Sequence, residues 1–312
     1  MTDPSSVSSS GPGGRGPDPF ASVSKGDDAE LEVTVPTKTL PGARGERRGE
    51  PGHSARHLIA TGRGPVDRGV ADMLESVIGL DERERVRDTD DYPWRMICSL
   101  QIEGPLGAAI GTGWLAGPRT VITAGHCVFH PQIGGWADRV VLRAGRDLSR
   151  AVVTLESSDF STTTAWKNQL DPNFDYAAIH LTEADAAAVE RVGWFCTALL
   201  GDAELQGRRV NVSGYPADKG GTTQWHAAKQ VLFVSPHRLF YDVDTHGGQS
   251  GAPVWIQDDP DEVPRVVGIH AYGTGATPSQ LGQEANSAPR INQDVFARIQ
   301  GWVDRDAPGA AA

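Results

Sequence analysis

The sequence predicts an all-β protein built from antiparallel β-barrels. The 312-residue chain holds 37 Gly and 21 Pro, a composition that favours turns and short strands over long helices. From residue 92 onward, short apolar runs alternate with Gly, Pro, Asp and Asn turns, without the intervening helices of a βαβ protein. Short strands at this density are typical of barrels. The apolar runs cover residues 94–102, 109–116, 120–128, 139–144, 151–156, 177–181, 209–214, 229–234, 239–243, 252–256 and 264–272.

The two ends of the chain depart from this pattern. Residues 1 to about 55 are poor in aromatic residues and rich in Ser, Gly, Pro, Arg and Glu. Such a segment cannot bury enough apolar surface to offset the entropy of ordering it, so we predict a disordered N-terminal segment. Near the C-terminus, four apolar residues recur at intervals of four, which predicts an amphipathic helix packed on the body. They are Ile291, Val295, Ile299 and Val303.

The charge of the chain limits its partners. The net charge is −11, so a nucleic-acid backbone or an anionic membrane surface is not an expected partner. No run approaches the roughly 18 apolar residues that a membrane helix needs. We expect a monomer without a cofactor.

A serine lies among glycines in the stretch 244–253, just before the apolar residues 254–256. A serine hydroxyl becomes an effective nucleophile only with a nearby base and with donors for the oxyanion it creates. The glycines allow a tight turn that exposes backbone N–H groups, and Gly248 and Ser250 are spaced to supply two of them. On its own, such a stretch is also common in ordinary loops.

Two upstream segments supply partners for this serine. A predicted strand ends in Ala-Gly-His at His126, and Asp175 stands at the start of another short apolar strand. Alone, each of these residues is more often structural. Together, His, Asp and Ser in this chain order correspond to the base, the orienting acid and the nucleophile of one type of serine hydrolase.

These segments resemble those of the chymotrypsin-like serine endopeptidases, and within them the bacterial glutamyl endopeptidases. The resemblance covers roughly residues 76–302, and its most specific parts are residues 76–79, 112–114, 123–127, 174–176, 213–216 and 244–253. It implies two six-stranded barrels with the active site between them. We expect residues 76–190 to form the first barrel, with His and Asp, and residues 191–312 to form the second, with Ser and the helix.

The resemblance also implies a role for each residue in the hydrolysis of peptide bonds through an acyl-enzyme. Ser250 is the expected nucleophile, His126 the general base and then acid, and Asp175 the residue that holds the imidazole tautomer. The N–H groups of Gly248 and Ser250 form the expected oxyanion hole. Gln249 stands where trypsin-type enzymes carry the Asp that pairs with the new N-terminus, so that activation switch is not expected here.

A processing site is expected between Glu75 and Ser76. Mature glutamyl endopeptidases begin with a sequence similar to residues 76–79, and an enzyme of this specificity could cut after Glu75 itself. We therefore predict a zymogen in which residues 1–75 are a propeptide. The alternative is an unprocessed disordered tail.

Specificity is predicted to rest on Thr245 and His270, which match the residues that bind the substrate glutamate in the resembling family. A hydroxyl and an imidazole N–H can both donate to a carboxylate, which predicts cleavage after Glu or Asp. Asp244 supports an alternative, because an Asp six residues before the nucleophile selects Arg and Lys in trypsin. A second alternative is a non-catalytic binding module on the same fold.

The sequence alone settles neither the pairing of the cysteines nor the cellular compartment of the protein. The odd number of cysteines, Cys98, Cys127 and Cys196, favours reduced, buried thiols, although a bridge between Cys98 and Cys127 is an alternative. The first thirty residues lack an apolar stretch flanked by basic residues, which argues against an ordinary secretory signal, whereas the resemblance implies export.

We expect no metal site. His126 and His130 are four residues apart, a spacing that can hold zinc on a helix. The segment is predicted as a strand and a turn instead, and no third ligand is apparent.

Overall fold

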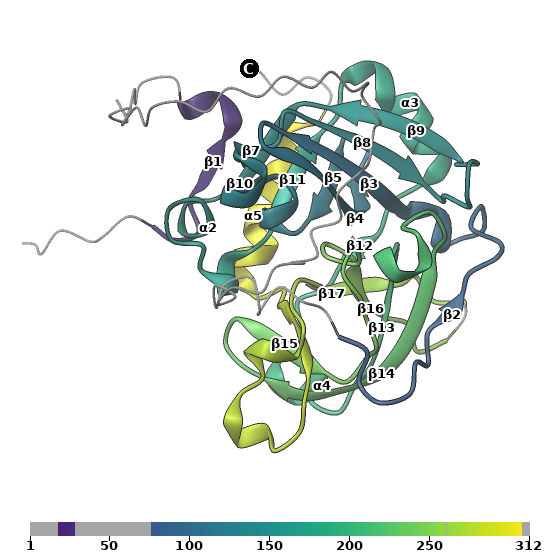
Figure 1. The fold of residues 1–312 in the computed structure, drawn as a ribbon, viewed down its shortest axis with the longest axis vertical. Helices are drawn as coiled ribbons and strands as arrows, with labels where there is room; N and C mark the ends of the chain where they lie inside the picture. Colours follow the sequence, from purple (N-terminus) through teal and green to yellow (C-terminus); the bar gives the residue numbers. More distant parts are fainter. Residues whose placement is uncertain (1–17, 29–75, 260, 308–312) are drawn as a thin grey trace, which may run out of the picture.

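The computed structural model describes residues 18–28, 76–259 and 261–307. They form two mainly antiparallel sheets, each curled on itself, with a long C-terminal helix beside the first (Figure 1). This is the all-β, chymotrypsin-like arrangement predicted from the sequence. Within the described residues, no helix is long and apolar enough to cross a membrane.

The first sheet has the strand order β1-β10-β11-β5-β4-β3-β8-β9. Strands β9 and β10 are separated by Ser158 alone, and they pair with β8 and β11 respectively, so they act as two halves of one bent strand that closes the barrel. Counted this way the barrel has the six expected strands, with β1 added at an edge. The strands are β1 (Ser22–Ser24), β3 (Ile97–Gly104), β4 (Gly107–Gly117), β5 (Thr120–Thr123), β8 (Arg139–Ala144), β9 (Val153–Ser157), β10 (Asp159–Thr163) and β11 (Ala177–His180).

The second sheet has the order β12-β17-β16-β13-β14-β15-β18, and β2 pairs with β14. Strands β2 and β12 hold two residues each, which leaves six longer strands for this barrel. Bridges from Gly268 to Arg290 and from Tyr272 to Ser287 bring the two ends of the sheet together. The strands are β2 (Glu84–Arg85), β12 (Cys196–Thr197), β13 (Arg209–Gly214), β14 (Trp225–Val234), β15 (Arg238–Tyr241), β16 (Pro253–Ile256), β17 (Arg265–Ile269) and β18 (Asn286–Pro289); a separate hairpin consists of β6 (Phe129–His130) and β7 (Gly135–Trp136).

Each barrel encloses its own apolar core. The first core includes Leu100, Trp114 and Ile122, all fully buried, and the second includes Val212 and Val254. The register of β3 with β4 runs without interruption from Ile97 opposite Trp114 to Gly104 opposite Gly107, so this hairpin forms a rigid wall of the first barrel.

Helix α5 (Gln293–Arg305) is the predicted amphipathic helix. Asn292 caps it by accepting the Val295 N–H at 3.0 Å. Val295, Ile299 and Trp302 are buried in the first core, and the predicted Val303 is partly buried against it. The other α-helices among the described residues are α2 (Thr164–Gln169), α3 (Glu183–Val192) and α4 (Asp202–Leu205).

Residues 18–28 differ from the predicted disordered segment. Ser22–Ser24 form strand β1, which pairs with β10, and a 3-10 turn follows over Lys25–Asp28. The physical reason is tertiary contact: Phe20 finds an aromatic partner in Phe174, with the ring centroids 4.8 Å apart, and strand β10 pairs along its edge with β1. The other residues of the predicted segment 1–75 lie outside the described residues.

Candidate active site

His126 lies in a 3-10 turn, Gly125–Cys127, directly after β5. Its backbone N–H donates to Oδ1 of Asp175 at 2.8 Å, and its Nδ1 lies 2.7 Å from Oδ2 of the same carboxylate. The turn needs a glycine before the histidine, since a Cβ on Gly125 would lie 2.8 Å from Asp175 Oδ1. The Ala-Gly-His motif is therefore the local geometry that brings the imidazole onto the carboxylate.

Asp175 is fully buried between a 3-10 turn, Pro172–Phe174, and strand β11. The hydroxyls of Thr163 and Thr162 donate to the carbonyls of Phe174 and Tyr176, each at 2.9 Å. Two side chains of β10 thus hold the backbone on both sides of the carboxylate.

Tyr272 is a partner of Asp175 that the motifs did not reveal. Its hydroxyl donates to Asp175 Oδ2 at 2.6 Å, the oxygen that also faces the imidazole. Its ring centroid is 6.5 Å from that of His126, and the side chain is buried. The available signal was position: Tyr272 follows His270 by two residues, so an extended backbone points both side chains to the same side.

Charge and burial set the proton affinities of this cluster. Burial would lower the pKa of His126, but the Asp175 carboxylate outweighs burial and raises this pKa well above its ordinary value. Burial, followed by the charge of Asp175, raises the pKa of Tyr272 well above the ordinary value for a phenol. Tyr272 therefore remains a hydrogen-bond donor across the physiological pH range.

Ser250 lies in a glycine turn whose backbone only glycine adopts easily. Gly248 has φ +102° and Gly251 has φ +87°, both in the region that L side chains avoid. A Cβ on Gly251 would overlap the Thr112 carbonyl and the Thr123 hydroxyl. This close approach packs the serine turn against β4 and β5 of the first barrel.

Thr112 of β4 is the residue that joins the serine turn to the first barrel. Its N–H donates to the Ser250 carbonyl and its hydroxyl to the Gly248 carbonyl, both at 2.8 Å. The same hydroxyl accepts the Tyr215 N–H at 3.0 Å. These bonds hold the backbone of the serine turn at Gly248 and Ser250 against the first barrel.

The serine turn also contacts the histidine turn. The Cys127 thiol donates to the Ser250 carbonyl at 3.7 Å, and a Cβ on Gly251 would lie 2.8 Å from the Ala124 nitrogen. Ser250 is therefore adjacent to Cys127, which follows His126, and Gly251 is adjacent to Ala124, which precedes Gly125. The structure brings Ser250, His126 and Asp175 to one site where the two barrels meet.

The cysteines carry free thiols. Cys98 and Cys127 are both buried, whereas Cys196 is exposed rather than buried as predicted. Burial raises the pKa of Cys98 to about 12, so this thiol is an inert core residue. The Cys98–Cys127 bridge considered from the sequence is not formed.

The predicted specificity residues lie behind the serine turn. The Gly251 N–H donates to the His270 carbonyl at 2.6 Å, and His270 Nδ1 lies 2.6 Å from the hydroxyl of Tyr241 on β15. Burial, with a smaller contribution from His126, lowers the pKa of His270 to about 3, so this imidazole is neutral near pH 7. The buried Thr245 hydroxyl has no hydrogen-bond partner within the described part of the chain.

Ser76 lies next to Thr245. The Thr245 N–H donates to the Ser76 carbonyl at 3.3 Å. Asn286, a buried residue of β18, holds Ser76 from both sides: its Oδ1 accepts the Ser76 N–H at 3.3 Å and its Nδ2 donates to the Ser76 carbonyl at 2.7 Å. Asn286 was not apparent from sequence, and only its polar character within a buried strand hinted at a role. Glu75 lies outside the described residues.

Asp244 is occupied by the segment that follows Ser76. Its two carboxylate oxygens accept the N–H groups of Ile78 and Glu82, at 2.8 Å and 2.9 Å. The side chain is fully buried, with Lys229 Nζ at 3.9 Å. Asp244 thus anchors residues 78–82 to the second barrel.

His130 has a structural environment. Its Nδ1 accepts the Gln132 N–H at 3.2 Å, and its ring stacks on Trp166 with centroids 6.3 Å apart. Burial, followed by the charge of His126, lowers the pKa of His130 to about 4.

A second Ser-His-Asp arrangement lies on the far side of the first barrel. His180 Nδ1 contacts Asp306 at 2.8 Å and its Nε2 contacts the Ser161 hydroxyl at 2.9 Å. Ser161 is almost fully buried and also bonds Ser24 of β1. The serine is covered by β1, so this network is structural.

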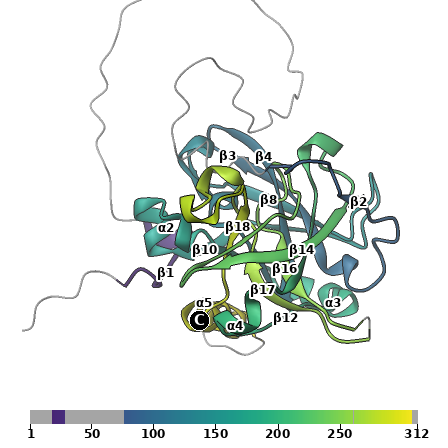
Figure 2. The ribbon, with the colours of Figure 1, turned by 90° about the horizontal axis from the view of Figure 1, so that it is seen from below.

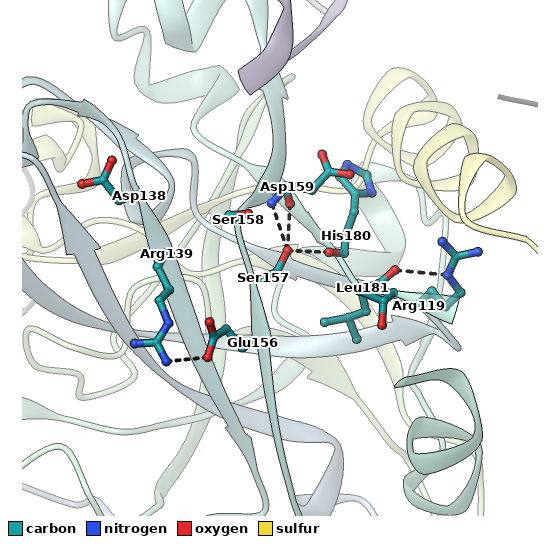
Figure 3. A pocket seen from close by; sticks show the side chains of 10 residues that line it. Arg119, Asp138, Arg139, Glu156, Ser157, Ser158, Asp159, His180 and Leu181 are labelled. Carbon is teal, nitrogen blue, oxygen red and sulfur yellow. Dashed lines mark hydrogen bonds and ion pairs between the residues drawn. The ribbon is translucent and has the colours of Figure 1, made fainter. Parts of the chain in front are cut away.

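A pocket of about 460 Å³ lies next to His180 (Figure 3). The Ser157 hydroxyl donates to the His180 carbonyl there, and Arg139 pairs with Glu156. None of its lining residues belongs to the cluster around Asp175. They are Arg119, Asp138, Arg139, Glu156, Ser157, Ser158, Asp159, His180, Leu181 and Thr182.

Comparison with known proteins agrees with this geometry. A family model described as a trypsin-like peptidase domain matches residues 111–269. The glutamyl endopeptidase of Bacillus licheniformis is 34% identical over 233 residues, which cover 73% of this chain and 69% of that protein. The chain belongs to the trypsin-like peptidase family. A protein named extracellular metalloprotease, from Bacillus subtilis, is also 34% identical over 233 residues, which cover 74% of this chain and 70% of that protein.

The fold of this trypsin-like peptidase is shared with a solved glutamyl endopeptidase bound to MPD. The TM-score is 0.63 at 24% identity, and the match covers 73% of this chain and 99% of the other. Together with the 34% identical glutamyl endopeptidase and the family model, this shows that the protein is a serine endopeptidase that acts on protein or peptide substrates. Among residues 18–28, 76–259 and 261–307, no three His, Cys, Asp or Glu side chains lie close enough together to hold a metal ion. The described part of this chain therefore offers no candidate ligands for a metal such as the name of the B. subtilis protein implies.

Proposed function

We propose that this protease cleaves peptide bonds after glutamate, with Ser250 as nucleophile, His126 as general base and acid, and Asp175 as the residue that orients the imidazole. Attack by Ser250 on the substrate carbonyl transfers the hydroxyl proton to His126 and gives a tetrahedral oxyanion. The N–H groups of Gly248 and Ser250 stabilise that oxyanion. His126 then protonates the leaving amine, and water hydrolyses the acyl-enzyme by the same steps.

The position of Ser76 is the observation that supports glutamate specificity most strongly. A neutral His270 and a Thr245 hydroxyl can donate hydrogen bonds to a carboxylate, but they carry no positive charge. Cleavage between Glu75 and Ser76 would create an ammonium group at Ser76, whose carbonyl is already bonded to the Thr245 N–H. The processed chain would then supply the cation that the pocket needs.

This arrangement also explains why processing would activate the enzyme. Before the cut, the Ser76 nitrogen is a neutral amide held by Asn286. After the cut, the same atom is charged, and Asn286 can hold it without neutralising it. We therefore propose that the chain is a zymogen whose glutamate pocket is completed by its own processing, with residues 1–75 as the propeptide and residues 76–190 and 191–312 as the two barrels.

The environment of Asp244 argues against trypsin-like cleavage after Arg or Lys. Both of its oxygens are already bonded to backbone N–H groups. A substrate guanidinium would have to displace those donors from a fully buried carboxylate. The cost of leaving buried donors unpaired, roughly 1–3 kcal/mol for each, opposes that exchange.

Specificity is tested with matched peptides that differ only in the residue before the cut. Hydrogen bonds to a charged group contribute about 1.5–3 kcal/mol each, so we expect kcat/KM to be at least about tenfold higher for Glu than for Gln. Faster cleavage after Arg would overturn the glutamate assignment and leave the triad intact. Ser250→Ala is the control: it should fold normally, lose turnover and no longer react with a fluorophosphonate, and an unchanged rate would contradict the nucleophile assignment.

N-terminal sequencing of the active enzyme tests the processing step. A start at Ser76 is expected, and active enzyme that begins far from this residue would contradict it. Analytical ultracentrifugation of the same sample tests the expected monomer.

A further inference from the structure

The first barrel carries a docking surface for the chain's own N-terminal segment, residues 18–28. This surface consists of the edge of β10, the start of α2 and one side of α5. In Figures 1 and 2, β1 lies beside β10 and α2, although β1 is distant from both in the sequence. Strand β1 pairs antiparallel with β10, with Ser22 opposite Thr163 and Ser24 opposite Ser161.

Backbone bonds extend this pairing beyond the strand. The Thr164 N–H and hydroxyl both donate to the Ala21 carbonyl, at 2.8 Å and 2.9 Å, and the Ala165 N–H donates to the Pro19 carbonyl at 3.3 Å. These bonds cover the edge of β10, which would otherwise present unpaired backbone groups to other chains.

Side chains of α5 add a second set of bonds. Arg298 Nε donates to the Phe20 carbonyl at 2.8 Å, and Trp302 Nε1 donates to the Ser22 hydroxyl at 2.9 Å. On the opposite side, Lys25 Nζ donates to the Ala137 carbonyl at 2.7 Å. The segment is thus bonded to parts of the chain that lie more than 100 residues away.

The docked segment is connected to the catalytic carboxylate. Phe20 packs edge-on against Phe174, the residue directly before Asp175. The β10 threonines whose hydroxyls hold the backbone around Asp175 are the residues opposite β1: Val23 faces Thr162 and Ser22 faces Thr163. Loss of the segment would therefore uncover the strand and the ring that support Asp175.

We infer that residues 18–28 stay bound to the first barrel after the chain is cut at Glu75–Ser76, so that the active protease consists of two chains. This inference rests on the proposed processing site. None of the contacts that hold the segment involves the peptide bond at residue 75, so cutting there breaks none of them. The N-terminal part of the propeptide then serves as a structural subunit of the mature enzyme.

The experiment uses the full chain with Ser250→Ala, which prevents self-processing, and with a recognition sequence for a sequence-specific protease inserted within residues 29–75. After the cut, native size-exclusion chromatography and intact-mass measurement show whether the N-terminal fragment co-elutes. We expect the two fragments to co-elute in a one-to-one ratio at micromolar concentration and to separate in denaturant. Separation under native conditions, with the large fragment still folded by circular dichroism, would overturn the inference.

Two variants test whether retention uses this surface. Phe20→Ala removes the contact with Phe174 and should weaken fragment binding by about tenfold or more. Gly26→Ala is the matched control in the same segment, since a Cβ there meets no atom within 4 Å, and it should bind as the parent does. Equal retention of all three fragments would show that the described contacts do not hold the segment.

Activity gives a separate readout in the chain that retains Ser250. After the same cut, Phe20→Ala should lower kcat severalfold with little change in KM, because the ring supports Asp175 and not the substrate pocket. The external cut in the Ser250→Ala chain makes the retention results independent of the chain's own processing, which N-terminal sequencing of the wild type tests by itself. An unchanged kcat in Phe20→Ala after loss of the fragment would contradict the link to Asp175.

Discussion

Tyr272→Phe is expected to shift the acidic limb of the kcat/KM profile to higher pH. The Tyr272 hydroxyl donates at 2.6 Å to the Asp175 oxygen that also faces His126 Nδ1. Without this donor, that oxygen presents more negative charge to the imidazole and favours its protonated form. The pKa of His126, already raised by Asp175, therefore rises further. In the proposed mechanism His126 must be neutral to accept the Ser250 proton, so a higher pH is needed for the same rate.

The size of the shift follows from the strength of the lost bond. A hydrogen bond to a charged group contributes about 1.5–3 kcal/mol, and one pKa unit corresponds to about 1.4 kcal/mol. If roughly half of the bond energy acts on the imidazolium form, the limb moves by about half a unit to one unit. The ring itself is retained, so water remains excluded from Asp175 and the plateau rate should change little. Tyr272 is thus a positioning residue, which acts on substrate only through Asp175 and His126.

The assay measures kcat/KM for a Glu peptide from pH 5 to 9 for the wild type and two tyrosine variants. Tyr241→Phe is the control, because the Tyr241 hydroxyl contacts His270 Nδ1 and not the triad. It should leave the acidic limb in place and reduce the preference for Glu over Gln by about tenfold. A Tyr272→Phe limb that stays in place, or moves to lower pH, would refute the role assigned to this hydroxyl.

Three further predictions follow from the structure. Gly251→Ala should lower the free energy of unfolding by roughly 2–4 kcal/mol, because φ is +87° at this position and the added Cβ would overlap β4 and β5. Gly247→Ala is the control: its Cβ meets open space, so the free energy of unfolding in urea should change by less than about 0.5 kcal/mol. Asp244→Asn leaves one side-chain acceptor for two backbone donors, so it should cost about 1–3 kcal/mol and keep the preference for Glu over Arg in the peptide assay. Burial lowers the pKa of His270 to about 3 and that of His226 to about 4, whereas in the unfolded chain both imidazoles take up a proton near pH 6.5. The free energy of unfolding should therefore keep its full contribution from these groups above about pH 6.5 and decrease toward pH 4. A urea midpoint that stays constant between pH 7 and 4.5 would contradict this.

Strands with apolar runs were predictable, and strands of small polar residues were not. The run 139–144 coincides with β8 and the run 252–256 contains β16. By contrast, β10 consists of Asp159–Thr163 and β18 of Asn286–Pro289, and neither has an apolar pattern. Four of the five residues of β10 and all four of β18 are nevertheless buried. Their hydroxyl and amide groups are paired across the fold, and such long-range pairing leaves no mark in a local window.

The same distinction applies to the site. His126 and the serine turn were recognisable because each depends on its own neighbours, namely Gly125 before the histidine and the glycines around Ser250. The roles of Tyr272 and Asn286 depend on residues 97 and 210 positions away, so no spacing rule could show them. Asp244 is the instructive case: its distance from Ser250 suggested a substrate-binding role, whereas its partners lie 166 and 162 positions upstream.

Thr112 shows how the two barrels maintain one site without a covalent bridge. The described cysteines, Cys127 included, are free thiols. The hydroxyl and N–H of Thr112 instead bond the carbonyls of Gly248 and Ser250. These bonds join the barrels and hold the backbone at both residues of the proposed oxyanion hole, so we expect a change that separates β4 from the serine turn to lower turnover as well as stability. Hydrogen bonds at this position form in both a reducing and an oxidising compartment, whereas a disulfide persists only in an oxidising one.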